Sequence, residues 1–142
     1  MQLAKYIEQA FAPATVNVKQ KPGDFHRFDV LWTPTVLIFD EQGKERFRIE
    51  GYLPKDEFTA HLLMGLGRVA FMSKKWSEAE QFYDEVIQKY PNSSIAPEAV
   101  YWRGVSRYKK TSDHHELGKV VTELKQKYPN SPWNKRAVPW EA

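Results

Sequence analysis

A four-residue sequence occurs twice in the second half of this chain, as Tyr90-Pro91-Asn92-Ser93 and as Tyr128-Pro129-Asn130-Ser131, 38 residues apart. A period of about 20 to 50 residues indicates stacked units, because each unit buries its apolar face only against its neighbours. Each copy ends a segment whose apolar residues recur at helical spacing. These stripes contain Trp76, Ala79, Phe82, Tyr83, Val86, Ile87 and Tyr90 in the first unit, and Leu117, Val120, Val121, Leu124 and Tyr128 in the second.

Each of these two helices is preceded by another helical segment that contains a glycine. Gly67 follows Leu66, and Gly104 lies four residues before Tyr108. Two helices can approach closely at a glycine, because it has no side chain. We therefore expect two helical hairpins with Gly67 and Gly104 at the helix contacts.

The first half of the chain alternates short helical and strand patterns. Leu3, Ile7 and Phe11 have the spacing of a short helix over residues 2–11, which stops before Pro13. Pattern and turn residues then predict a half-buried strand over 14–19, a short helix or turn over 24–30, a buried strand over 33–40, its hairpin partner over 45–50, and a helix from Pro54.

The composition excludes several classes of protein. The chain has no cysteine, so it contains no disulfide bond, thiolate metal ligand or cysteine nucleophile. No run approaches the roughly 18 to 20 apolar residues of a membrane span, and the start, MQLAKYIEQA, lacks the apolar stretch of a signal peptide. The net charge is only +3, and most basic residues alternate with acidic ones. We therefore expect a soluble protein that binds neither membrane nor nucleic acid.

No spacing in the sequence is typical of a catalytic or metal site. The adjacent His114 and His115 point in different directions at a helix start, and no third ligand completes a set. Asp113 and Glu116 fit a helix cap with an acidic first turn. Nucleophile-elbow, phosphate-loop and zinc-protease spacings do not occur. The sequence predicts no enzyme activity, no catalytic residue, no cofactor and no metal.

The first half resembles the C-terminal half of the thioredoxin fold over about residues 2–63. The resemblance is carried by VNVKQ, a Pro-Gly turn, TPTVLIF, a glycine turn, an alternating strand and Gly51. It implies a cis peptide bond before Pro34, in Thr33-Pro34-Thr35; the alternative is an ordinary trans proline that opens a strand. The family's preceding strand and Cys-x-x-Cys turn have no counterpart here, so its dithiol chemistry does not carry over.

The absent strand raises a question about the sheet. In the thioredoxin family this strand lies between those that match residues 14–19 and 35–40. Its absence leaves unpaired backbone groups, which the chain resolves by pairing these strands directly, by borrowing a strand from a second copy, or by losing order. We favour self-association into a homo-oligomer, because the apolar residues 36–39 exceed what a lone hairpin covers.

The second half resembles the tetratricopeptide repeat (TPR). The first unit matches the pattern at Leu66, Gly67, Trp76, Ala79, Tyr83 and Pro91. In the second unit Leu117 takes the place of the small Ala79, as in a terminal cap. The stretch YPNSSIAPEAVYWRGVSRYK is similar to TPR proteins of bacterial envelope assembly, such as the Tol-Pal-associated and outer-membrane-assembly families.

The TPR resemblance also implies a partner-binding groove. Its lining residues would be Met64, Arg68, Met72, Tyr101, Val105, Tyr108 and Lys109. Methionine and tyrosine adapt to varied partners, and arginine and lysine pair with peptide carboxylates. Arg68 and Val105 replace the asparagines of the family's carboxylate clamp, so the clamp's ligand class is not implied. The alternative is that Tyr101 and Tyr108 belong to the core.

Together these patterns predict an α/β plus all-α fold. A truncated thioredoxin-like α/β unit over residues 1–63 is followed by two TPR-like helical hairpins over 64–142, and the helix at about 54–73 is shared. The expected function is a non-catalytic interaction module for an unknown protein or peptide. The alternative is the C-terminal part of a thioredoxin-family thiol-disulfide oxidoreductase whose dithiol segment is missing from this chain. Cytoplasm is the default location, and a true N-terminus upstream would favour the periplasm.

Overall fold

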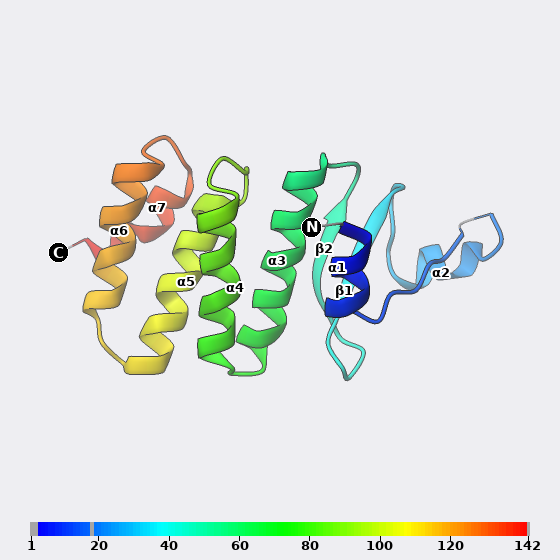
Figure 1. Ribbon diagram of the computed structural model, residues 1–142, viewed down its shortest axis with the longest axis horizontal. Coiled ribbons are helices and arrows are strands. Elements are labelled where there is room, and N and C mark those ends of the chain that lie inside the picture. The colour runs from blue at the N-terminus through cyan, green and yellow to red at the C-terminus, as the bar shows by residue number, and fades with distance from the viewer. Residues whose placement is uncertain (1–2, 18, 142) are drawn as a thin grey trace.

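A computed structural model describes residues 3–17 and 19–141, and its helices and strands lie side by side along the longest axis of the molecule (Figure 1). The strand hairpin lies toward one end and the C-terminus lies at the other. The elements are α1 (Leu3–Ala10), α2 (Pro22–Arg27), β1 (Thr35–Phe39), β2 (Glu45–Glu50), α3 (Lys55–Met72), α4 (Trp76–Lys89), α5 (Ala96–Thr111), α6 (His115–Lys127), α7 (Trp133–Ala137) and the 3-10 helix η1 (Val138–Trp140). This is the predicted combination of a small α/β unit and a helical region.

Strands β1 and β2 form an antiparallel hairpin, as their alternating and apolar patterns predict. The turn between them is closed by Asp40, whose carboxylate accepts the backbone amide of Lys44 at 3.0 Å. Gly43 lies in the same turn at φ 82°, a left-handed conformation that costs glycine nothing. The hairpin packs one face against α1 and α3, with Ile38 and Ile49 buried beside Leu62.

The predicted strand over residues 14–19 is wrong for the residues that the structure describes. Residues 14–17 are exposed and have no regular structure, residue 19 lies in a turn, and Val18 lies outside the described residues. A strand is stable only beside a ladder partner, and the described sheet contains only β1 and β2. The alternating pattern of this segment indicates a strand propensity, but the described fold places no partner strand beside it.

The Thr33–Pro34 peptide bond is cis, as the thioredoxin resemblance implied.

The helical part is held by close contacts at the two predicted glycines. A Cβ atom added to Gly67 would overlap the buried ring of Tyr83 on α4, and one added to Gly104 would overlap Val120 on α6. Helix α3 contacts the hairpin as well as α4, so one helix belongs to both cores. The repeated tyrosine also links the units, because the Tyr128 hydroxyl donates to the carbonyl of Pro91 at 2.7 Å.

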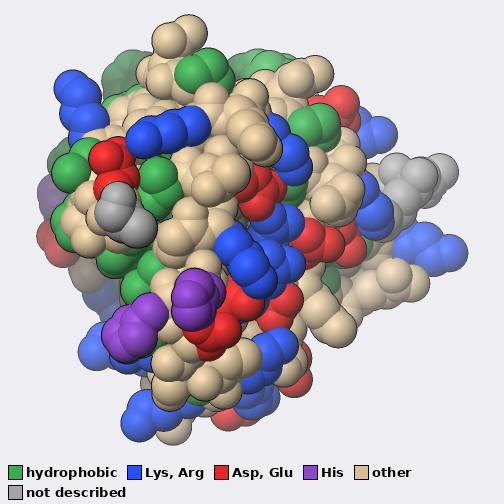
Figure 2. Space-filling view, turned by 90° about the vertical axis from the view of Figure 1, so that its left-hand side faces the viewer, with side chains coloured by type: hydrophobic (Ala, Val, Ile, Leu, Met, Phe, Trp, Pro, Cys, Tyr) green, Lys and Arg blue, Asp and Glu red, His purple; other side chains and the backbone are tan. Residues whose placement is uncertain are grey.

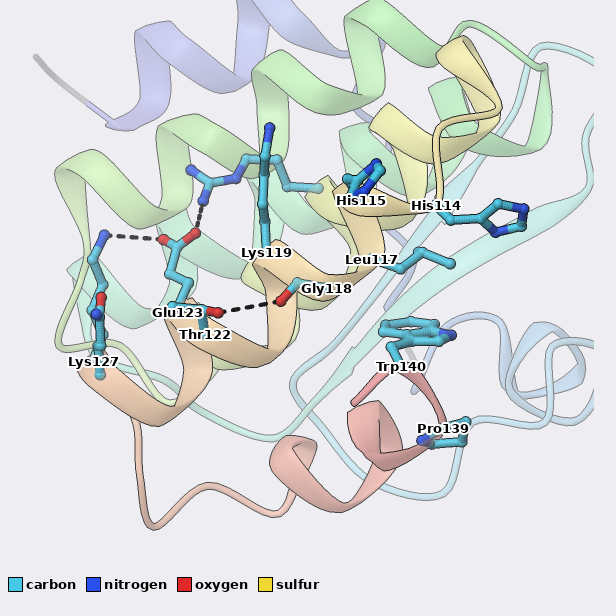
Figure 3. A pocket seen from close by; sticks show the side chains of 12 residues that line it. His114, His115, Leu117, Gly118, Lys119, Thr122, Glu123, Lys127, Pro139 and Trp140 are labelled. Carbon is cyan, nitrogen blue, oxygen red and sulfur yellow. Dashed lines mark hydrogen bonds and ion pairs between the residues drawn. The ribbon is translucent and has the colours of Figure 1, made fainter. Parts of the chain in front are cut away.

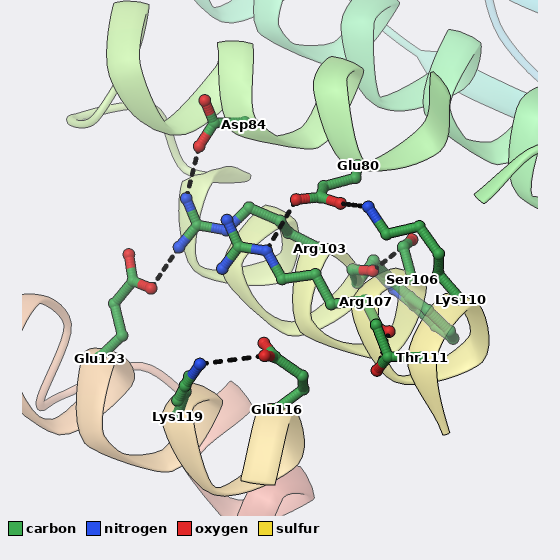
Figure 4. A network of polar contacts seen from close by, with 11 residues as sticks. Glu80, Asp84, Arg103, Ser106, Arg107, Lys110, Thr111, Glu116, Lys119 and Glu123 are labelled. Carbon is green, nitrogen blue, oxygen red and sulfur yellow. Dashed lines mark hydrogen bonds and ion pairs between the residues drawn. The ribbon is translucent and has the colours of Figure 1, made fainter. Parts of the chain in front are cut away.

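A charged network joins α4, α5 and α6 (Figure 4). Arg103, only 6% exposed, donates to Asp84 at 2.6 Å and to the carboxylate of Glu123. One turn further along α5, Arg107 donates to Glu80 at 2.9 Å. Figure 4 shows these side chains crossing from α5 to the helices on either side. The network fixes how the two hairpins stack, because a buried guanidinium is stable only with both partners in place.

Candidate partner-binding surface

An aromatic cluster connects α5 with the C-terminal segment. It consists of Tyr101 and Trp102 on α5, Trp133 on α7 and Trp140 on η1, and so contains three of the five tryptophans of the chain. The Tyr101 ring stacks on Trp140, with centroids 4.7 Å apart, and lies 5.0 Å from Trp133. All four side chains are half-buried. Rings that are packed on one side and accessible on the other are well suited to contacts with a partner.

Two arginines flank this cluster. The Arg68 guanidinium from α3 lies 5.1 Å from the ring centroid of Trp102, and that of Arg136 from α7 lies 4.5 Å from Trp133. Stacking on an aromatic face holds a guanidinium in place while its N–H groups remain free to donate. The cluster therefore carries two oriented cations supplied by different helices.

Glu98 on α5 is the carboxylate next to Arg68 in this cluster. Its carboxylate is 3.7 Å from the Arg68 guanidinium and accepts from the indole nitrogen of Trp102 at 3.3 Å. Burial raises the pKa of Glu98, and the nearby charges of Arg68, Arg136 and His61 lower it by less. The cluster thus carries two guanidinium groups and one carboxylate, so its local charge is positive.

The predicted groove residues differ in their placement. Met64 is 1% exposed and belongs to the core, where Tyr6 and Phe47 pack, so its prediction as a contact residue is wrong. The α/β unit covers this side of α3, which a freestanding repeat would leave open. In contrast, Met72 is 47% exposed and lies one turn beyond Arg68 on the same helix.

The α5 positions of the predicted groove are only partly accessible. Tyr101, Val105 and Tyr108 are half-buried, and Lys109 is exposed. The ring centroids of Tyr108 and His114 are 5.5 Å apart, and those of Tyr101 and Trp140 are 4.7 Å apart. Both tyrosines therefore have packing roles within the helical array, and the structure brings Arg68 and Tyr101 to the same cluster through Trp102.

Sequence reasoning missed several members of this surface. These are Glu98, Trp102, Trp133, Arg136 and Trp140. One signal was available, because Trp102 follows Tyr101 directly and the last ten residues of the chain hold two further tryptophans. Their meeting depends on how the C-terminal segment folds back on α5, which no helical period encodes.

A hollow of about 950 Å³ lies at the C-terminal end of the array, next to the aromatic cluster (Figure 3). It is lined by α6 residues, including Gly118 and Lys119, and by Trp140 from η1. Figure 2 shows that end of the molecule, where histidine side chains lie beside basic and acidic ones. Trp140 therefore borders both the aromatic cluster and this hollow, which is open to solvent and is lined by apolar, polar and charged side chains together.

The two histidines at this end contact residues close to them in sequence, His114 the Tyr108 ring and His115 the Asp113 carboxylate. The backbone amide of His115 donates to the Asp113 carboxylate at 2.9 Å just before α6, whose N-cap residue is His114 and not the predicted Asp113, and Glu116 lies in the first turn as predicted. This bond, followed by the His115 side chain, lowers the pKa of Asp113. Among residues 3–17 and 19–141, no group of three or more His, Cys, Asp or Glu side chains could hold a metal ion.

The arrangement is that of a helical-repeat array joined to a small α/β unit through a common helix. Comparison with known families gives the same result. Residues 2–65 match the model of a thioredoxin-like domain, and residues 62–93 match that of a tetratricopeptide repeat. The chain therefore combines a thioredoxin-like unit with TPR, as the sequence patterns predicted. Searches of curated proteins and of solved structures find no match.

The tetratricopeptide match bears on function, because such repeats suggest protein partners and a protein-interaction module. In the described part of the chain, no helix combines the length and the apolar character needed to cross a membrane.

Proposed function

We propose that this chain is a non-catalytic interaction module that binds an acidic peptide segment of a protein partner across the aromatic cluster. The observation that carries the proposal is the pair of arginines stacked on Trp102 and Trp133. The stacked guanidinium groups would donate to carboxylates of the partner, and the rings would contact an adjacent apolar side chain.

The charge at this surface supports an acidic partner. Arg68 and Arg136 face one internal carboxylate, that of Glu98, whose pKa is raised by burial. A partner carboxylate would add a counter-charge at a site that has two cations. A basic peptide would instead meet both arginines, which opposes binding because like charges brought close together cost free energy.

The absence of catalysis is proposed on chemical grounds. Thiol-disulfide exchange needs a thiolate that attacks a disulfide, and this chain has no cysteine. An insulin-reduction assay with dithiothreitol tests this part of the proposal. We expect the rate with the protein to equal the rate without it, and an accelerated rate would contradict the non-catalytic assignment.

Binding can be measured through the tryptophans of the cluster. Short acidic peptides that contain one aromatic residue are titrated while intrinsic fluorescence is recorded, beside peptides in which every acid is replaced by lysine. We expect saturable quenching with the acidic set only. Arg68→Gln combined with Arg136→Gln should weaken binding about a hundredfold or more, since two charge-assisted hydrogen bonds are lost and each contributes roughly 1.5 to 3 kcal/mol.

The matched control changes two lysines outside the cluster, Lys89→Gln on α4 and Lys119→Gln on α6, whose side chains are 55% and 66% exposed. It removes the same net charge and should leave the affinity within about twofold. Equal weakening by both double variants would mean that only net charge matters, and would contradict a site at the cluster. Melting curves of each variant show whether the fold is retained.

A further inference from the structure

The outer edge of β1 has backbone groups without partners. The Pro34 carbonyl accepts the Gly51 amide at 2.8 Å, and the Asp40 amide donates to Lys44 at 2.9 Å. Since antiparallel strands alternate, residues 34, 36, 38 and 40 face β2, and residues 35, 37 and 39 face away. Within the described residues, no hydrogen bond reaches the outward amides or carbonyls of residues 35, 37 and 39.

The two edges of the hairpin differ in charge. Strand β2 has the sequence ERFRIE, and four charged side chains protect it against pairing with another strand. Strand β1 has the sequence TVLIF and carries no charge. Its side chains pack against β2, α3 and α1, and the Phe39 ring lies 5.5 Å from that of Phe28, while its outer backbone edge has no strand beside it in the described part of the chain. An uncharged edge with free backbone groups is the usual template for the addition of a strand.

Large exposed apolar side chains lie at one end of this edge. Leu31 is 81% exposed and Trp32 70% exposed, both just before β1, and Tyr52 is 79% exposed just after β2. The hydrogen bond between Gly51 and Pro34 brings the two segments together. Exposed apolar residues grouped beside a free strand edge are typical of an interface.

We propose that two copies of this chain associate through β1, which pairs antiparallel with β1 of the second copy around a twofold axis at Leu37. The register follows from the outward residues. Leu37 pairs with Leu37 of the second copy, and Thr35 pairs with Phe39 of the second copy. These are the residues whose backbone groups are free, and their even spacing about Leu37 lets each one meet an outward-facing counterpart.

A second copy fits this edge for reasons of charge and stability. Because β1 carries no charge, antiparallel pairing of two copies brings no like charges together, whereas β2 has charged side chains at four of its six positions. A two-stranded sheet is marginal alone, and the dimer would form one continuous four-stranded sheet. The pair would also cover part of Phe39, which is 38% exposed. This inference is independent of the proposed peptide binding, which uses the opposite part of the molecule.

Sedimentation velocity between about 1 and 100 micromolar tests the proposal on the full chain. We expect a concentration-dependent shift toward about twice the chain mass of 16.6 kDa. Leu37→Lys places two like charges at the twofold axis and should raise the dissociation constant at least tenfold. Thr35→Lys, at a half-buried and less central position, should act in the same direction if Leu37→Lys impairs folding.

Glu50→Lys on β2 is the control, because it adds a lysine on the strand whose edge is already charged. Its dissociation constant should stay within about twofold of the unmodified chain. Hydrogen exchange adds a second readout, since the amides of Thr35 and Leu37 should gain protection as concentration rises. A monomer at all concentrations, with rapid exchange at both amides, would overturn the proposal and leave the edge to a strand from another protein. A dimer unaffected by either β1 variant would overturn it as well.

Discussion

Two helical glycines provide a test of the packing because they differ in what surrounds them. Gly67 lies in α3 against α4, and an added Cβ atom would lie 2.8 Å from Cδ1 and 2.9 Å from Cζ of Tyr83. Gly118 lies in α6, where an added Cβ atom would meet nothing within 4 Å. Changing each one to alanine applies the same chemical perturbation to a filled site and to an open site.

The expected free energies follow from two opposing terms. Alanine is better than glycine in a helix interior by about 0.8 to 1 kcal/mol, and this gain applies to both sites. At Gly67 the new methyl group would be about 1 Å inside ordinary carbon contact of roughly 3.5 to 4 Å. The Tyr83 ring is rigid and fully buried, so it cannot move aside without disturbing the core. Overpacking of this kind costs about 1 to 3 kcal/mol, and we place it at the upper end.

Gly67→Ala should therefore lower the free energy of unfolding by about 1 to 2 kcal/mol, whereas Gly118→Ala should raise it by about 0.5 to 1 kcal/mol. Urea unfolding followed by circular dichroism measures both values, with the unmodified chain in the same experiment. At this chain length 1 kcal/mol corresponds to roughly 4 °C in the melting temperature. Gly67→Leu should destabilise more than Gly67→Ala because it inserts a larger group at the same contact.

Stabilisation of both alanine variants by similar amounts would contradict the close contact at Gly67. Such a result would mean that α3 and α4 do not approach each other at Gly67 as described. An unchanged m-value is needed for the comparison, because a change in m-value would indicate an altered denatured state rather than altered packing.

Two further predictions concern charged groups. Arg103→Met should lower the free energy of unfolding, measured in urea, by about 2 to 3 kcal/mol. The loss is smaller than for a fully buried ion pair because water reaches Asp84. A loss under about 0.5 kcal/mol would show that Arg103 does not hold the two hairpins together. Burial raises the pKa of Glu98 in the folded state above its value in the unfolded chain. Protonated Glu98 therefore contributes to the free energy of unfolding at low pH, and this contribution is lost as pH rises through the raised pKa. Glu98→Gln should reduce this loss, and unfolding curves with the same pH dependence in both proteins would contradict the burial of Glu98.

Local pattern was sufficient for most of the helical half. The apolar stripe that contains Ala79 and Tyr83 is buried as predicted, since the side that faces a neighbour is encoded in the spacing of the residues themselves. The glycines followed the same logic, because a missing side chain permits a close contact wherever the next helix lies. The hairpin of β1 and β2 was also accessible, since its turn residues and its alternating strand lie close together in sequence.

Predictions that required a distant neighbour failed or were missed. Residues 14–17 alternate like a strand, yet no ladder partner is available to them in the described fold. Met64 has the position of a groove residue in a repeat and is buried because the α/β unit packs on that side of α3.

The helical hairpins, the strand hairpin and the glycine contacts could therefore be predicted from the residue pattern alone, because neighbours in sequence stabilise them. Which surfaces remain available to a partner depends on the packing of distant segments. The aromatic cluster forms because the segment after α6 folds back on α5, and the edge of β1 is free because no described strand lies beside it. Both results depend on contacts between residues far apart in the chain, and the periodicity of a single element does not specify which partner covers it.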